Sequence, residues 1–236
     1  VWENLSGNSW GEEKIIAQIP PVHDLASIDI VDVMGDGIPC LVWSAMLPQS
    51  GRPTLQYMPL SKGKPAHLLT KIDNQMGKQV EIQYRHSSVF YQNDERADSK
   101  WENKMASHFH VVSKMIILDQ IGGTSFTSSF LYHDGHYDGR EREFKGFGYV
   151  EQSDTETFQY LSNPVHSDTS TPTVTKTWIH NGAISKQSKK SYYQSGQDAF
   201  KLFPSIIENC DQLDAKELID AFNALAVQLI RKDVYG

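Results

Sequence analysis

This sequence has little cysteine, no long apolar run and no excess of basic charge. Its two cysteines, Cys40 and Cys210, stand far apart without metal-type spacing, so they predict neither a disulfide framework nor a zinc site. No apolar run approaches the roughly 18 residues of a membrane span, and we expect no direct membrane insertion. Acidic residues outnumber basic ones by 29 to 22, which gives a net charge of −7. Because the basic residues are scattered, we expect no nucleic-acid partner.

Two nucleotide-binding motifs are missing as well. The sequence has neither the G-x-G-x-x-G fingerprint nor the G-x-x-x-x-G-K phosphate loop, so dinucleotide and phosphate-loop functions lack support and we expect no cofactor. At 236 residues with 39% hydrophobic content, the chain can bury the core of one large or two modest domains. Its first residue is Val1, from which we expect a fragment of a longer protein.

The stretch 131–151, LYHDGHYDGREREFKGFGYVE, organises the chain. It holds two turn signals, Asp134-Gly135 and Asp138-Gly139, between runs that alternate apolar and polar residues. We predict turns at both signals and a hairpin around them. Gly146 and Gly148 then predict a close approach of another backbone to the second strand.

Alternation with a period of two predicts strands along most of the chain, and the clearest is 78–85. Further strands are expected at 28–30, 41–43, 54–58, 109–119, 124–132 and 173–180, with turns at 74–77, 120–123 and 181–182. The polar segments 92–107, anchored by Trp101, and 153–171 are predicted to be surface loops. Proline and glycine at 46–64 indicate a domain boundary, which separates a domain 1–60 from a domain 61–236.

One helix is expected at the C-terminal end of this mainly β, antiparallel fold, over about 214–232. Asp214 and Glu217 have the spacing of a capping box. The apolar residues that follow lie on one helical face, and Arg231 and Lys232 suit the negative end of the helix dipole. We expect this amphipathic helix to dock on a sheet.

The loop 32–37 has part of a calcium-binding pattern. Asp32 and Asp36 stand at the first and fifth positions and Gly37 at the sixth. Met34 and Cys40 occupy positions where a hard cation needs oxygen. A turn in which the two aspartates cap backbone amides is the favoured interpretation, and calcium binding stays open.

Other side chains that could carry chemistry are interpreted as structural. The pair His133 and His136 spans a predicted tight turn, and the pair His108 and His110 has no carboxylate at a set spacing. The carboxylates of Glu141 and Glu143 alternate with arginines, which favours cross-strand ion pairs over a glycosidase pair. We therefore predict no catalytic, cofactor-binding or metal-binding residue.

Six segments, taken in order, resemble the B subunits of bacterial Tc (insecticidal toxin complex) toxins and the related plasmid virulence B proteins. The most specific is YDGREREFKGFGYVEQ. The six segments are 28–44, 65–84, 108–115, 132–152, 173–183 and 230–236. The chain departs from the family pattern at Met34 and Cys40 and lacks the proline pair expected near 106–109.

The resemblance implies a fold and a function. Residues 1–60 would form an FG-GAP, β-propeller-type blade, and residues 61–236 a segment of a YD/Rhs-like β shell. In such toxins the B subunit pairs with a C subunit to enclose a cytotoxic polypeptide, and its propeller docks on the pore-forming A subunit. This implies a secreted, non-enzymatic structural segment whose neighbours are the remainder of the B subunit, the C subunit and the A subunit.

Two other functions remain open. A carbohydrate-binding or adhesion module would use Trp43, Trp101 and Trp178, although core packing is the preferred interpretation for all three. The other is an enzyme, which a metal assay that finds stoichiometric zinc at the histidines would support. For a shell segment we expect the excised chain to expose apolar sheet surface and to associate, which light scattering would detect.

Overall fold

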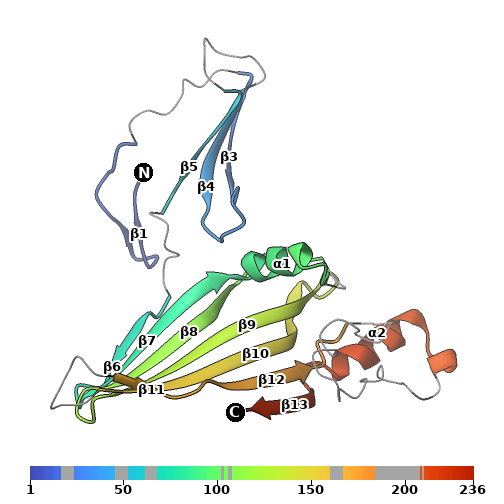
Figure 1. The fold of residues 1–236 in the computed structure, drawn as a ribbon. Helices are drawn as coiled ribbons and strands as arrows, with labels where there is room; N and C mark the ends of the chain where they lie inside the picture. The colour runs from blue at the N-terminus through green and yellow to red at the C-terminus, as the bar shows by residue number, and fades with distance from the viewer. Residues whose placement is uncertain are drawn as a thin grey trace. The chain divides into compact units, whose positions relative to one another are not determined.

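The computed structural model describes residues 1–16, 24–45, 53–61, 68–101, 104–105, 108–159, 167–183, 208 and 210–236. The chain separates into two compact units (Figure 1). One contains residues 1–34 and 38–65, and the other contains residues 35–37 and 66–236. Each unit is described by itself.

The first unit is built from short antiparallel strands. The strands are β1 (Asn4–Leu5), β2 (Ser9–Trp10), β3 (Ala26–Val31), β4 (Cys40–Ala45) and β5 (Leu55–Pro59). β1 pairs with β2, and β3, β4 and β5 form a three-stranded sheet in that order. The predicted strands are confirmed, and β4 is the buried one because Cys40 and Trp43 are almost fully enclosed.

The second unit is dominated by one eight-stranded antiparallel sheet, drawn as the fan of long strands in Figure 1. The order is β13-β12-β10-β9-β8-β7-β6, and β11 also pairs with β10. The bounds are β6 (Lys71–Asp73), β7 (Lys78–His86), β8 (His110–Asp119), β9 (Thr124–Asp138), β10 (Glu143–Gln159), β11 (Ser167–Thr169), β12 (Thr173–Ile179) and β13 (Leu229–Tyr235). The mainly β, antiparallel prediction is confirmed.

Local sequence explains most of these strands. The predicted strand 78–85 is β7, and 109–119 and 173–180 correspond to β8 and β12. The turn between β8 and β9 forms because Asp119 Oδ1 accepts hydrogen bonds from the backbone N–H groups of Ile121 and Gly122. These bonds hold the pKa of the Asp119 carboxyl below its ordinary value.

The predicted turn at Asp134-Gly135 is wrong. β9 runs through both residues to Asp138, and only the second Asp-Gly signal ends the strand. Asp134 takes a left-handed φ of 55° inside the strand and is buried. The Nδ2 of Asn181 donates to the Asp134 carbonyl oxygen at 2.8 Å, which satisfies that buried backbone group.

The predicted close approach is wrong at Gly146, stays a prediction at Gly148, and is observed at Gly135. A Cβ on Gly146 would meet nothing within 4 Å, whereas one on Gly135 would lie 2.7 Å from Met105 Sδ and 2.8 Å from Trp101 Cζ3. Gly146 instead has a φ of 103° where the register of β9 and β10 shifts, so it forms a β-bulge.

Two predicted loops contain regular structure. Helix α1 (Ser87–Arg96) ends inside the segment 92–107 and covers its first residues. It begins without a side-chain cap at His86, so no capping residue in the sequence marks its start. Trp101 is buried, as predicted. The segment 153–171 holds the end of β10 and all of β11, while its residues 160–166 lie outside the described part of the chain.

The predicted helix at 214–232 is shorter than expected and is followed by a strand. A 3-10 turn at Cys210–Gln212 precedes α2 (Ala215–Ala224). The capping box is confirmed, because Asp214 accepts from the N–H of Glu217 while Glu217 accepts from the N–H of Asp214. The chain then turns at Val227, which has a φ of 70°, and residues 229–235 pair with β12 as β13. Strand pairing overrides the continuing apolar periodicity.

Aromatic residues form the core of the second unit. Phe90 of α1, Trp101 and Phe147 of β10 are buried together, with Tyr132 and Phe144 packed against them. The Trp101 and Phe147 rings meet edge to face at 6.1 Å, a favoured geometry for aromatic pairs. This cluster holds α1 against the organising hairpin, β9–β10.

Candidate functional site

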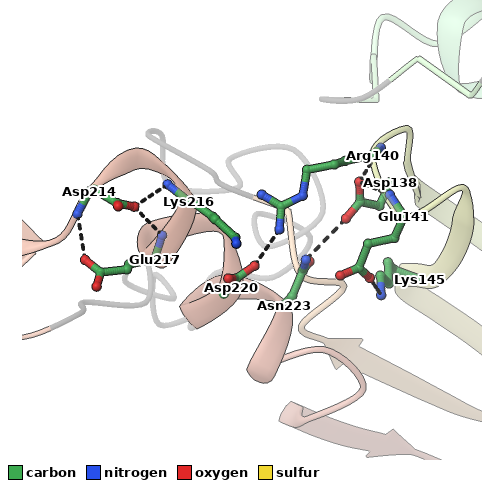
Figure 2. Close-up of polar contacts among 9 residues, drawn as sticks. All are labelled: Asp138, Arg140, Glu141, Lys145, Asp214, Lys216, Glu217, Asp220 and Asn223. Carbon is green, nitrogen blue, oxygen red and sulfur yellow. Dashed lines mark hydrogen bonds and ion pairs between the residues drawn. The ribbon is translucent and has the colours of Figure 1, made fainter.

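The β9–β10 turn is built around the carboxylate of Asp138. Its Oδ1 accepts from the backbone N–H of Arg140 at 2.8 Å and of Glu141 at 3.3 Å (Figure 2). The bond from Arg140 is the main reason that the pKa of the Asp138 carboxyl lies below its ordinary value. The second Asp-Gly signal therefore forms a turn because the ionised aspartate satisfies two backbone donors.

The carboxylates that resembled a catalytic pair neutralise one lysine. Lys145 Nζ lies 2.5 Å from Glu141 Oε2 and 2.6 Å from Glu143 Oε2. Bonds to both carboxylates, that to Glu141 first, raise the pKa of the Lys145 amine. The predicted cross-strand ion pairing is wrong, because both carboxylates pair with Lys145, which follows them on the same side of the hairpin.

Helix α2 is fixed to this turn by side chains on its exposed face. Arg140 Nη2 lies 2.6 Å from Asp220 Oδ1, and Asn223 Nδ2 donates to Asp138 Oδ2 at 3.2 Å (Figure 2). Both members of the ion pair are about half exposed, so it contributes only about 0.2–1 kcal/mol. On the other face of the helix, the buried Phe222 stacks on His180 at 6.0 Å. Packing and polar contacts together position α2 beside the hairpin.

A buried carboxylate in α1 links the helix to the sheet. Asp94 Oδ2 accepts from Trp101 Nε1 at 2.6 Å and lies 2.7 Å from His133 Nδ1. The side chains of Asp94 and His133 are 10% and 15% exposed. An Nδ1–H on His133 can donate to this carboxylate alongside the indole N–H. This contact joins β9 to α1, and Asp94 was missed because it is distant from His133 in sequence.

The His133 ring begins a row of side chains that crosses four strands. It lies 5.2 Å from the ring of Tyr149, which stacks at 5.0 Å on Trp178. Arg231 of β13 lies over the Trp178 ring at 5.4 Å, in the geometry of a cation–π contact. Register places these four residues opposite one another. Sequence reasoning missed the row because each strand contributes only one member.

The histidine pair His133 and His136 and the loop 32–37 are the remaining candidates for a metal site. The tight turn predicted between His133 and His136 is wrong, because β9 continues through both residues. In the loop 32–37, Gly35 and Gly37 have left-handed φ values of 66° and 75°, as a sharp turn requires. Among the described residues, no three His, Cys, Asp or Glu side chains gather as a metal site would need. Calcium binding at this loop stays a prediction.

A serine motif in the first unit has the wrong structural context. Residues 7–11 read GNSWG and so match G-x-S-x-G, the spacing of a hydrolase nucleophile elbow. That elbow requires a turn from a strand into a helix, whereas Ser9 begins β2 of a two-stranded hairpin. The motif therefore does not indicate a hydrolase.

The tryptophans that could have bound a sugar are enclosed. Trp43, Trp101 and Trp178 are only 4%, 6% and 3% exposed, so their ring faces pack in the interior. Neither helix in the described part of the chain has the length and apolar character that a membrane crossing requires.

Comparisons with known proteins identify a matching family model and similar solved structures. Residues 7–182 match the family model described as the insecticide toxin TcdB middle/N-terminal region. The fold is similar to a chain in a Photorhabdus luminescens Tc holotoxin pore, with a TM-score of 0.73 and 26% identity over 100% of this chain and 11% of that one. It is also similar to a chain in a TcdB2–TccC3 crystal structure, with a TM-score of 0.72 and 26% identity over 100% of this chain and 12% of that one.

A comparison with curated proteins gave no match. The chain spans about a tenth of the length of the solved chains that it resembles. The family model covers most of the sequence, and the solved structures match the whole chain. The chain therefore belongs to the family of the insecticide toxin TcdB middle/N-terminal region and is a region of the Tc toxin B-subunit type.

Proposed function

We propose that this chain is a non-enzymatic wall segment of a secreted Tc toxin B subunit. In this role the second unit forms part of a YD/Rhs-like β shell that encloses a cytotoxic polypeptide. The observation that carries the proposal is the long antiparallel sheet, matched along the whole chain by chains of toxin complexes. Those structures are a Tc holotoxin pore and a TcdB2–TccC3 complex, which supports a C subunit and a pore-forming A subunit as partners.

The residues that could have carried chemistry support a structural role. The carboxylates of Glu141 and Glu143 are occupied by Lys145, and His133 is held by Asp94. Their contacts close a turn in the first case and fasten a helix to a sheet in the second. These are the interactions that give a wall its shape.

We propose that the first unit is a blade of the FG-GAP, β-propeller-type domain, which docks on the A subunit. Its three-stranded sheet carries large apolar side chains that are exposed within the described residues, among them Ile28, Ile30 and Leu55. A blade buries such side chains against neighbouring blades. The domain limits 1–60 and 61–236 remain part of this proposal.

A wall has one side that meets the cargo, and β9 offers a direct test. Phe126 and Leu131 are 37% and 49% exposed and lie an odd number of residues apart on a regular part of the strand, so they point to opposite faces of the sheet. A photoreactive amino acid would replace each one in the full-length B subunit assembled with its C subunit. We expect cross-links to the cargo from one position only, and cross-links from both or from neither would refute the wall role.

A further inference from the structure

The segment that follows β12 packs directly against helix α2. Residues 180–183 are all buried. The ring of Phe222 on α2 stacks on the His180 ring, with their centroids 6.0 Å apart. A Cβ on Gly182 would lie only 3.1 Å from Asn223 Oδ1, so the backbone of this segment is also in close contact with the helix. His180 is therefore buried where the end of β12 meets α2.

The hydrogen bonds of His180 show which form of its ring the structure holds. The backbone N–H of Gly182 donates to His180 Nδ1 at 3.1 Å. A ring nitrogen that accepts a hydrogen bond carries a lone pair and no proton, so this ring is neutral. The backbone N–H of His180 also donates to the Gln228 carbonyl oxygen at 2.8 Å, and its carbonyl oxygen accepts from the N–H of Val227 at 2.7 Å. One residue thus joins β12, α2 and the chain that leads into β13.

A proton on the His180 ring would oppose this arrangement for two reasons. It would occupy the lone pair that now accepts a hydrogen bond, which would leave two donors facing each other. It would also place a charge in a site that is only 9% exposed. Histidine gains its charge between about pH 5 and 8, and a histidine that is buried in its neutral form favours the opened state on acidification.

Other charged groups on the neighbouring elements already have partners. Asp220 of α2 pairs with Arg140, and Asp138 accepts from Asn223 (Figure 2). Asp134 is the buried carboxyl of β9, and a carboxylate favours the charged form of a neighbouring imidazole. The test below therefore also determines the direction of the pH effect. Further titratable or charged side chains on the elements around this contact include His136 of β9, Lys216 and Glu217 of α2, and Arg231 and Asp233 of β13.

We propose that His180 is a pH-sensitive contact for helix α2, which holds the helix while its ring is neutral and releases it when the ring is protonated. Release separates Phe222 from His180 and frees the amide of Gly182. The pairing of β9 with β10 involves neither group, so the hairpin stays intact. This inference does not depend on the wall role, because it concerns only how α2 is attached to the sheet.

The size of the effect follows from proton linkage. An exposed histidine has a pKa of about 6.5, and a proton that binds only the released form raises the opening equilibrium about tenfold for each pH unit below that value. The contact is therefore fully present above about pH 6.5 and is weakened about tenfold at pH 5.5. The pKa of the Asp138 carboxyl lies below its ordinary value, so this acceptor of Asn223 stays ionised over the same range.

Hydrogen exchange in the full-length B subunit tests the proposal at pH 7.5 and pH 5.5. Each rate is divided by that of an unstructured amide at the same pH, which removes the chemical effect of pH on exchange. We expect the protection of α2 and of the Gly182 amide to fall about tenfold at the lower pH. Protection of residues 152–156 in β10 should stay within about twofold. Constant protection of α2 would overturn the proposal, and so would a rise, which would show that a carboxyl such as Asp134 stabilises the charged ring.

Two variants identify the histidine that is responsible. In His180→Asn the amide Oδ1 can accept from Gly182 in place of Nδ1, and it does not titrate. The variant loses the stacking on Phe222, so the measured quantity is the ratio of α2 protection at the two pH values, which should stay within about twofold. His108→Asn is the control, because His108 lies beside Gly35, and it should keep the tenfold change. Equal ratios in the two variants would contradict the proposal.

A measurement on the wild-type chain decides the question if His180→Asn does not fold. Exchange of the imidazole Cε1–H, followed by mass spectrometry as a function of pH, reports the protonation of each histidine separately. We expect the midpoint for His180 to coincide with the midpoint of α2 release. A His180 ring that becomes protonated while α2 keeps its protection would refute the proposed contact.

Discussion

Replacing Gly135 by alanine tests how tightly the organising hairpin packs against the core. An added Cβ would lie 2.7 Å from Met105 Sδ, 2.8 Å from Trp101 Cζ3 and 3.2 Å from Phe147 Cε1. All three distances are shorter than ordinary van der Waals contacts between such atoms. Trp101 is held in place by its hydrogen bond to Asp94 and Phe147 is buried, so only the methionine can move easily.

Overpacking of this kind costs about 1–3 kcal/mol, which corresponds to a roughly five- to 140-fold change in the unfolding equilibrium constant at about 1.4 kcal/mol per tenfold. Urea denaturation followed by tryptophan fluorescence would measure it, at concentrations where light scattering detects no association. Gly139→Ala is the control, because a Cβ there meets nothing within 4 Å, and it should change stability by less than about 0.5 kcal/mol. Equal stabilities for the two variants would refute the packing argument.

Two further perturbations address the buried carboxylate and the turn. Asp94→Ala removes the acceptor from Trp101 Nε1–H and from His133, so unfolding in urea should become easier by about 1–3 kcal/mol for each donor, and a smaller loss than in Asp94→Asn would contradict this. Asp138 has a lowered pKa in the folded state, so it stabilises the fold above its ordinary value of 3.8 and this contribution disappears as the pH falls through the folded pKa. The stability difference between the wild-type chain and Asp138→Ala should therefore shrink on acidification, and a constant difference from pH 7 to pH 3 would disprove the assignment.

Local signals predicted the parts of the fold whose causes are local. The strand β7 follows from alternation alone, and the turn at Asp138 follows from a side chain that bonds to amides two and three residues away. The capping box at Asp214 marks the start of α2 correctly. In each case the residues that determine the structure stand within a few positions of one another.

The failures arise where distant residues decide. Asp134-Gly135 has the composition of a turn, but Asn181 bonds to the Asp134 carbonyl and the core has room for no Cβ at Gly135. The apolar periodicity beyond Ala224 continues a helical pattern, yet pairing with β12 makes a strand of residues 229–235. The row from His133 to Arg231 could not be predicted either, because it depends on the register of four strands.

The length of β9 and β10 determines how the hairpin responds to mechanical force. β10 has 17 residues and pairs with β9 from Glu143 to Phe158, which at about 3.3 Å per residue extends for roughly 50 Å. Its other side pairs with β12 over Tyr149–Asp154 and with β11 over Thr157–Gln159. A pull along the strands must break these hydrogen bonds together in shear, whereas a pull at right angles opens them one after another. The sheet is therefore stiff along the hairpin and compliant across it.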